Sequence, residues 1–119
     1  MLKGQNSSKS NVFSNYPHLK DLFGLLKSKI KALSPNIKEE YRVYYVSYRM
    51  DKCFVYLWPT KKAIWVYFRT GKNFKDQRKI CEKVPKGINP NFTMRAKVTP
   101  HNLEEIFELI VQSFYSLKT

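Results

Sequence analysis

The spacing of apolar residues predicts an amphipathic helix near each end of the chain. From Leu19 to Leu33, apolar residues recur every few positions with lysines between them, which is typical of a helix that buries one face. The same period returns from Leu103 to Phe114. Pro17 suits the first turn of the first helix, and Thr99-Pro100 supplies a hydroxyl cap and a proline for the second. We therefore expect helices that begin near Pro17 and near Pro100.

The segment between these helices has the composition and spacing of β-strands. It is rich in β-branched and aromatic residues, which favour a pleated surface. Short polar or proline-containing turns divide it, as in an antiparallel meander. The expected strands are Tyr41–Met50, Cys53–Trp58, Ala63–Arg69 and Phe92–Val98, with a further short strand within Ile80–Val84.

The resulting order, α-β-β-β-(β)-β-α, predicts an α+β fold. It consists of an antiparallel sheet of four to five strands, with the N- and C-terminal helices packed on one face. The chain has 119 residues, which suits a single domain. Residues 1–13 are polar and have no apolar period, so we expect a flexible tail that docks late through Val12 and Phe13. Residues 14–119 are expected to form one basic domain.

Alternation along the strands assigns side chains to the two faces of the expected sheet. The side chains expected to point into the core are Ile64, Val66, Phe68, Phe92, Met94, Ala96 and Val98. Those expected on the open face or at its edge are Trp65, Tyr67, Arg69, Arg95 and Lys97. An open face that combines aromatic rings with guanidinium groups can stack bases or follow a sugar-phosphate backbone. Alternatively, these rings form a second small core under residues 70–91, or a protein interface.

The charge of the chain favours a polyanionic partner. There are 22 Lys and Arg against 9 Asp and Glu, a formal net charge of +13. Most of the excess lies within residues 52–97, whereas residues 98–119 have a net negative charge. Clustered positive charge attracts nucleic acid. We expect the cations to gather on one exposed side, away from the acidic C-terminal helix.

The sequence therefore predicts a nucleic-acid-binding domain, with double-stranded DNA favoured over RNA. Lysine-rich loops are expected to contact phosphates, which position a protein without reading sequence. Contacts to about five phosphates predict a log-log salt slope near −4 to −5 on duplex DNA. The candidate nucleic-acid-binding residues are Arg42, Arg49, Lys61, Lys62, Trp65, Tyr67, Arg69, Lys72, Lys75, Arg78, Lys79, Lys83, Lys86, Arg95 and Lys97. The alternative hypothesis is an interaction module whose basic, aromatic face binds an acidic protein.

Other classes of function find little support in the residues. His18 and His101 have no recognisable catalytic partner, and no metal-ligand spacing or phosphate-cradling glycine loop occurs. Cys53 and Cys81 form neither a disulfide framework nor a metal cluster. We expect no catalysis, no cofactor and no bound metal. No apolar run approaches the length of a membrane span, and no signal core follows the N-terminus, so a cytoplasmic protein is expected.

The pattern resembles the domain-of-unknown-function 5655 family, also labelled "predicted transport protein", over about residues 13–117. The resemblance rests on an opening helix from Pro17-His18-Leu19, on strand segments, and on a closing helix from Leu103-Glu104-Glu105-Ile106 to Tyr115. The strand segments are Tyr45-Val46-Ser47-Tyr48-Arg49 before Phe54-Val55, and Lys61-Lys62-Ala63-Ile64-Trp65-Val66-Tyr67. The family implies an α+β domain that often accompanies nucleic-acid-handling modules. The order also resembles the double-wing DNA-binding architecture of a phage transcription activator. Residues 84–91 depart from the glycine-, histidine- and tryptophan-rich turn of the family.

Overall fold

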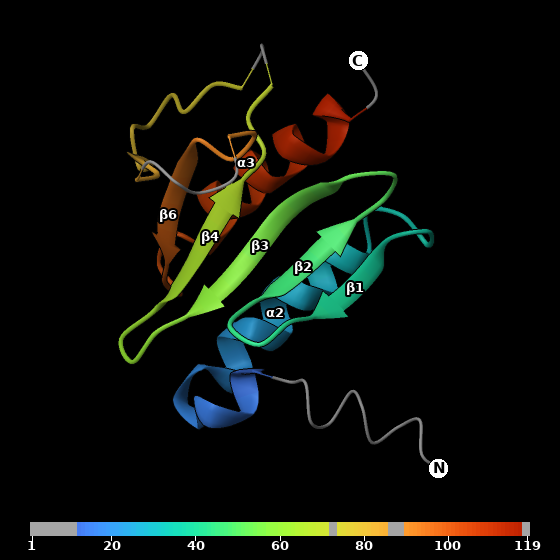
Figure 1. The fold of residues 1–119 in the computed structure, drawn as a ribbon. Coiled ribbons are helices and arrows are strands. Elements are labelled where there is room, and N and C mark those ends of the chain that lie inside the picture. The colour runs from blue at the N-terminus through green and yellow to red at the C-terminus, as the bar shows by residue number, and fades with distance from the viewer. Residues whose placement is uncertain (1–11, 72–73, 86–89, 118–119) are drawn as a thin grey trace.

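In the computed structural model, described for residues 12–71, 74–85 and 90–117, six antiparallel strands form one sheet (Figure 1). Their order is β1-β2-β3-β4-β6-β5. The strands are β1 (Lys38–Tyr41), β2 (Val46–Arg49), β3 (Cys53–Pro59), β4 (Ile64–Phe68), β5 (Glu82–Lys83) and β6 (Met94–Val98). The helices are the 3-10 helices η1 (Val12–Asn15) and η2 (Pro17–Leu19) and the α-helices α2 (Lys20–Lys31) and α3 (Leu103–Ser116). The predicted α+β class is confirmed, with one strand more than expected.

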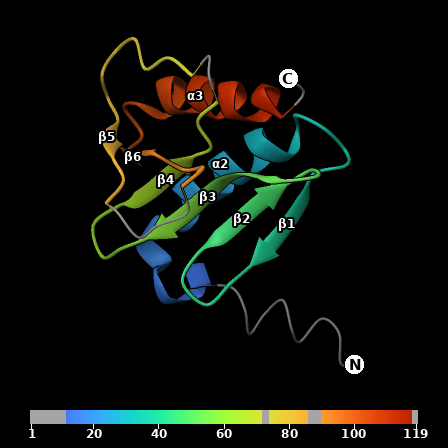
Figure 2. The same cartoon turned by 45° about the horizontal axis from the view of Figure 1, so that its top comes forward.

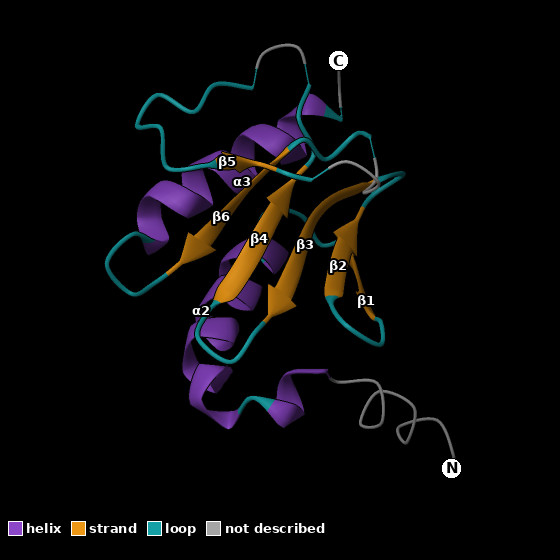
Figure 3. Ribbon diagram, turned by 60° about the vertical axis from the view of Figure 1, so that its left-hand side comes forward, coloured by secondary structure: helices purple, strands orange, loops and turns teal. Residues whose placement is uncertain are grey.

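Both α-helices pack on the same face of the sheet, as Figures 2 and 3 show. The core lies between them and the sheet, and the inward-facing Ile64, Val66 and Phe68 of β4 are all fully buried there. Leu26 of α2 and Ile106 of α3 are equally buried, which confirms the apolar stripes of both helices. None of the described helices is both long enough and apolar enough to cross a membrane. Among the residues that the structure describes, no helix lies over the opposite face of the sheet (Figure 1).

The predicted strand Tyr41–Met50 is wrong in its first half. A turn from Arg42 to Tyr45 interrupts it, closed by a hydrogen bond from the Arg42 amide to the Tyr45 carbonyl at 2.8 Å. β1 and β2 pair across this turn. The turn contains Val43 and Tyr44, both strand-favouring, and no glycine, proline or asparagine. The strand propensity of these residues therefore did not indicate the turn, because the pairing of β1 with β2 determines where the chain reverses.

The ends of two other elements also differ from expectation. Val12 and Phe13 are buried, and the Phe13 ring stacks on Phe23 with centroids 3.9 Å apart. α3 begins at Leu103, because Thr99 and Asn102 first form a turn in which the Thr99 amide donates to Asn102 Oδ1 at 2.7 Å. Val12 and Phe13 are therefore packed on the domain, and Thr99 and Pro100 begin a turn that precedes α3.

A polar network joins β1 to α2 on the covered side of the sheet. The fully buried Tyr48 donates its hydroxyl proton to Glu39 Oε2 at 2.6 Å. Lys27 Nζ lies 3.4 Å from the other oxygen of Glu39 and donates to the Tyr41 hydroxyl at 3.1 Å. Burial, and then the neighbouring Glu39 carboxylate, raise the pKa of Tyr48 far above its ordinary value. Lys27 is therefore committed to this network, and the exposed Lys31 also lies within 4.0 Å of Glu39.

Candidate functional site

Aromatic rings from β3, from β4 and from the residues just before β2 and β6 line the face of the sheet opposite the helices. The strand register aligns Trp58 of β3 with Trp65 of β4, and Trp65 with Lys97 of β6. Two residues along, Tyr56 of β3 is aligned with Tyr67 of β4, and Tyr67 with Arg95 of β6. We call this surface the aromatic face. Its rings belong to Tyr45, Tyr56, Trp58, Trp65, Tyr67 and Phe92.

The rings of the aromatic face contact one another. Tyr45 stacks on Trp58 with centroids 5.2 Å apart and an interplanar angle of 17°. Tyr56 stacks on Phe92 at 4.4 Å and 15°. Trp58 and Tyr67 lie 5.9 Å apart across the strands. These separations are those of favourable aromatic pairs, so the rings form a continuous layer across β3 and β4.

Arg95 and Lys97 lie over this layer at its β6 side. The Arg95 guanidinium carbon is 4.3 Å from the Trp65 ring centroid, and Arg95 Nη1 donates to the Tyr67 hydroxyl at 2.9 Å. Arg95 also donates from Nε and Nη2 to Glu82 Oε2, at 3.1 and 2.8 Å. Partial burial lowers the pKa of Arg95, but the hydrogen bonds to Glu82 and Tyr67 outweigh it and leave a net rise. The Arg95 guanidinium, which was expected to bind phosphate or a base, is thus bound to the Glu82 carboxylate. Lys97, whose Nζ lies 5.3 Å from the Trp65 ring centroid, is exposed.

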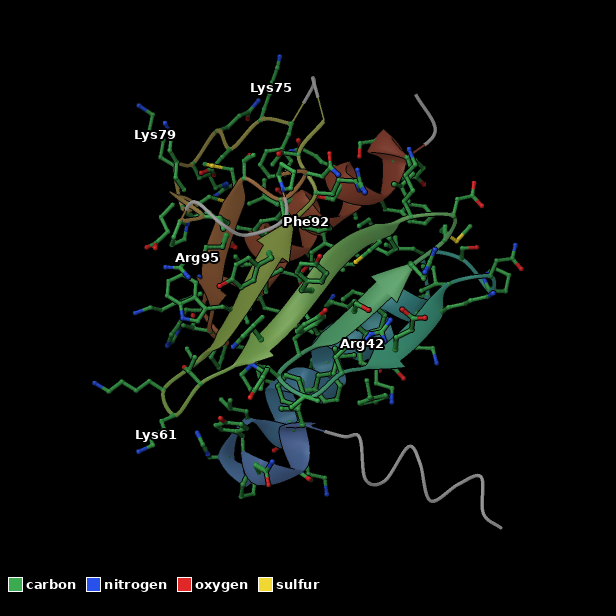
Figure 4. All side chains as sticks on the ribbon, viewed as in Figure 1. Arg42, Lys61, Lys75, Lys79, Phe92 and Arg95 are labelled. Carbon is green, nitrogen blue, oxygen red and sulfur yellow. The ribbon has the colours of Figure 1, made fainter. Side chains whose placement is uncertain are left out.

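Arg69 follows β4 on the same side. Its Nε donates to the Cys53 carbonyl at 2.8 Å, and its guanidinium lies 5.5 Å from the centroid of Phe92. Phe92 itself was expected to point inward, and this prediction is wrong. Phe92 is only 1% exposed, but it is buried against Tyr56 on the aromatic face (Figure 4). Phe92 therefore covers part of the face, much as a small second core would.

The β3–β4 hairpin presents Lys61 and Lys62 at its tip. Both are exposed, and Lys61 points away from the body of the molecule (Figure 4). The turn is held by the Thr60 hydroxyl, which accepts the Ala63 amide at 3.2 Å. A second hydrogen bond joins His18 Nε2 and the Lys61 carbonyl at 2.7 Å. Lys61 and Lys62 therefore lie on a turn that hydrogen bonds stabilise, next to η2.

The segment 74–81 lies against α3 and not on the aromatic face. The Lys75 amide donates to Gln112 Oε1 at 2.8 Å, and Gln112 Nε2 returns a hydrogen bond to the Lys75 carbonyl at 2.9 Å. Arg78 lines a cavity between this segment and α3, together with Glu105 and Glu108. The expectation that the cations gather on one side, away from the acidic helix, is therefore wrong for Lys75 and Arg78. Lys79 is exposed on the same segment and points outward (Figure 4).

The remaining candidate cations are dispersed. Arg42, in the β1–β2 turn, forms an ion pair with Glu40 at 3.2 Å. Arg49 at the end of β2 donates to the Asp51 carbonyl at 2.9 Å, and Lys83 is exposed on the edge strand β5. Lys72 and Lys86 lie outside the described residues. Among the candidates, the structure brings together Trp65, Tyr67, Arg69, Arg95 and Lys97.

Comparison with known proteins identifies the family. Residues 9–115 match the family described as Domain of unknown function (DUF5655). The chain belongs to this family. No curated protein and no solved structure matches the chain, so the likeness to a double-wing architecture stays a prediction.

Several rings of the site were not among the expected functional residues of this DUF5655 domain. Tyr45, Tyr56 and Trp58 contribute to the aromatic face, as does Phe92. Tyr56 and Trp58 alternate with the buried Val55 and Leu57 along β3, so the period of the strand could have placed them opposite the core. Tyr45 lies in the unexpected turn, and no sequence signal indicated it.

The two thiols of this DUF5655 domain are expected to react slowly when it is folded. Burial raises the pKa of Cys53 to about 11, and burial together with Asp76 raises the pKa of Cys81 to about 12. The thiolate is the reactive form, so at about pH 8 alkylation by iodoacetamide should be at least ~10-fold slower than in urea. A stabilising contribution from the protonated thiols is present below the unfolded pKa of about 8.5 and is lost as the pH rises toward the folded values. Mass spectrometry measures the labelling, and equal rates in the folded and unfolded protein would contradict this assignment.

Proposed function

We propose that this DUF5655 domain is a cytoplasmic, non-catalytic nucleic-acid-binding domain that uses the aromatic face and the β3–β4 hairpin. The observation that carries the proposal is the layer of tyrosine and tryptophan rings beside Lys97, on the face of the sheet opposite α2 and α3. Aromatic side chains and cations on one surface supply the two contacts that nucleic acids offer, base faces and phosphates.

The distribution of unpaired charge supports this assignment. Within the described residues, no carboxylate lies within 4.0 Å of the ammonium groups of Lys61, Lys62 or Lys97. All three are exposed. Together with the formal net charge of +13, they provide the electrostatic attraction that drives binding to phosphate backbones.

Residues 12–71, 74–85 and 90–117 contain no group of three or more histidine, cysteine, aspartate or glutamate side chains that could hold a metal. Asp76 uses both carboxylate oxygens on backbone amides, those of Ile80 at 3.1 Å and Cys81 at 2.8 Å. This carboxylate supports the loop, so we assign it a structural role.

A titration with labelled polynucleotides tests the proposed function. We expect binding of at least one of duplex DNA, single-stranded DNA or RNA in about 50 mM salt. The affinity should fall as the salt concentration rises, because cations on the protein displace counterions from the phosphates. Fluorescence anisotropy at two salt concentrations measures this dependence. Failure to bind any of the three polymers in low salt would overturn the proposal.

A second candidate function follows from the β1–β2 turn. Val43 and Tyr44 are 76% and 66% exposed, and Tyr44 lies near Trp58 at the edge of the aromatic face, with centroids 6.3 Å apart. Exposed tyrosine, tryptophan and arginine side chains are also typical of protein interfaces. An acidic protein partner is therefore favoured if the titration gives no binding to any nucleic acid.

A further inference from the structure

We infer that the aromatic face selects single-stranded nucleic acid, whose unpaired bases stack on the rings. This inference rests on the proposed function and narrows it, because charge alone favoured duplex DNA. It depends on the arrangement of the rings across the strands, on how few free cations accompany them, and on which charges are already paired.

The rings of the aromatic face are arranged in two rows that cross the strands. Trp58 of β3 lies opposite Trp65 of β4, Tyr45 from the turn before β2 stacks on Trp58, and Tyr56 and Tyr67 form a parallel row. Adjacent strands lie about 4.8 Å apart, so the rings cover a strip on the order of 10 Å across the strands. Trp58 and Trp65 are half-buried and Tyr67 is 8% exposed, so the two tryptophans offer the accessible ring surface. Aromatic side chains on RNA-binding sheets stack about two or three splayed bases. In a duplex the base faces are hidden by their neighbours, and only a single strand can present them.

Only some of the cations near the aromatic face are free of a carboxylate partner in the described chain. Arg95 is bound to Glu82, and Arg42, at the other side of the sheet, is bound to Glu40. Phosphate contact by either arginine would require it to leave its carboxylate. The cations near the aromatic face without such a carboxylate partner in the described chain include Lys61, Lys62, Arg69 and Lys97. Four phosphate contacts on a single strand predict a log-log salt slope of about −3, shallower than the slope of −4 to −5 expected for five duplex contacts.

Arg95, although paired with Glu82, still contacts two rings of the aromatic face. Its guanidinium lies over Trp65 and holds the Tyr67 hydroxyl. A guanidinium in this position fixes the orientation of both rings through a cation–π contact and a hydrogen bond. Arg95 is therefore a positioning residue for a stacking surface, and its bond to Glu82 is compatible with that role.

Intrinsic fluorescence tests the inference without a label, because the chain has two tryptophans and both, Trp58 and Trp65, lie on the aromatic face. Titration with a thymidine 12-mer should quench this fluorescence, and the 12-mer should bind at least ~10-fold more tightly than a 12-base-pair duplex. Trp65→Ala should weaken binding of the 12-mer by about 10-fold, whereas Trp65→Phe should stay within about 3-fold, since a phenyl ring still stacks. Tyr115→Ala removes an aromatic ring that is 53% exposed on α3 and should leave the affinity unchanged.

The outcomes separate this inference from the proposed function. Equal affinity for duplex and single strand, with no effect of Trp65→Ala and a slope near −4 to −5, would overturn the stacking inference and leave nucleic-acid binding intact. No binding of any polymer would overturn both. Circular dichroism of Trp65→Ala checks its fold, and if that variant is unfolded, the comparison of the 12-mer with the duplex and the salt slope still decide the matter.

Discussion

Replacing Phe92 by alanine is expected to lower the free energy of unfolding by about 3 kcal/mol, near the lower end of the range for buried phenylalanine. The Phe92 side chain is 1% exposed, although it lies on the face of the sheet opposite the helices. It stacks on Tyr56 at 4.4 Å, and the Arg69 guanidinium lies 5.5 Å from its ring. Truncation removes these contacts and leaves a gap that the surrounding residues fill only in part. Urea denaturation followed by circular dichroism measures the change.

Leu25→Ala is the matched control for this prediction. Leu25 is 52% exposed on α2, and its truncation should change the free energy of unfolding by less than about 0.5 kcal/mol. If Phe92→Ala cost no more than Leu25→Ala, Phe92 would not be packed, and the aromatic face would lack the layer described here.

The position of Phe92 could not be predicted from strand alternation, because this residue precedes β6. Alternation from Phe92 to Val98 assigned Phe92 to the same face as Ala96 and Val98, and both of those residues are indeed buried in the core. β6 begins only at Met94, however, and residues 90 and 91 form a turn. The Asn91 carbonyl accepts a hydrogen bond from the Thr70 amide at 3.0 Å. The period of two holds only within a pleated strand, so it could not place a side chain that precedes one.

The elements that depend on local pattern could be predicted. Both amphipathic helices, β3, β4 and the burial of Ile64, Val66 and Phe68 follow from apolar spacing. The outward direction of Trp65 follows from the same alternation. Each of these conclusions uses residues only a few positions apart, where helix and strand periods are informative.

The elements that depend on distant contacts could not be predicted. The backbone of Lys75 is bonded to the side chain of Gln112, 37 positions away, and Arg95 pairs with Glu82, 13 positions away. A count of charges along the chain cannot detect such pairs. It therefore assigned Lys75 and Arg95 to one phosphate-binding surface, although α3 holds the backbone of the first and a carboxylate holds the side chain of the second.

Reversing the charges of Lys61, Lys62 and Lys97 to glutamate is expected to weaken nucleic-acid binding by about 100-fold or more in low salt. These cations are exposed and have no carboxylate partner in the described chain. Glutamates at the same positions would repel phosphates beside the aromatic face. Fluorescence anisotropy with the thymidine 12-mer measures the loss, and circular dichroism verifies the fold.

The control is a second triple variant with the same change in formal charge. Lys52 lies in the turn at the opposite end of β3 from the hairpin, and Lys75 and Lys79 belong to the segment beside α3. Reversing these three should weaken binding by less than about 10-fold, because only long-range, screened attraction is lost. Lys27 and Lys31 are unsuitable controls, since new glutamates there would face Glu39. Equal losses in the two triple variants would show that diffuse net charge drives binding, and they would remove the hairpin and Lys97 from the interface.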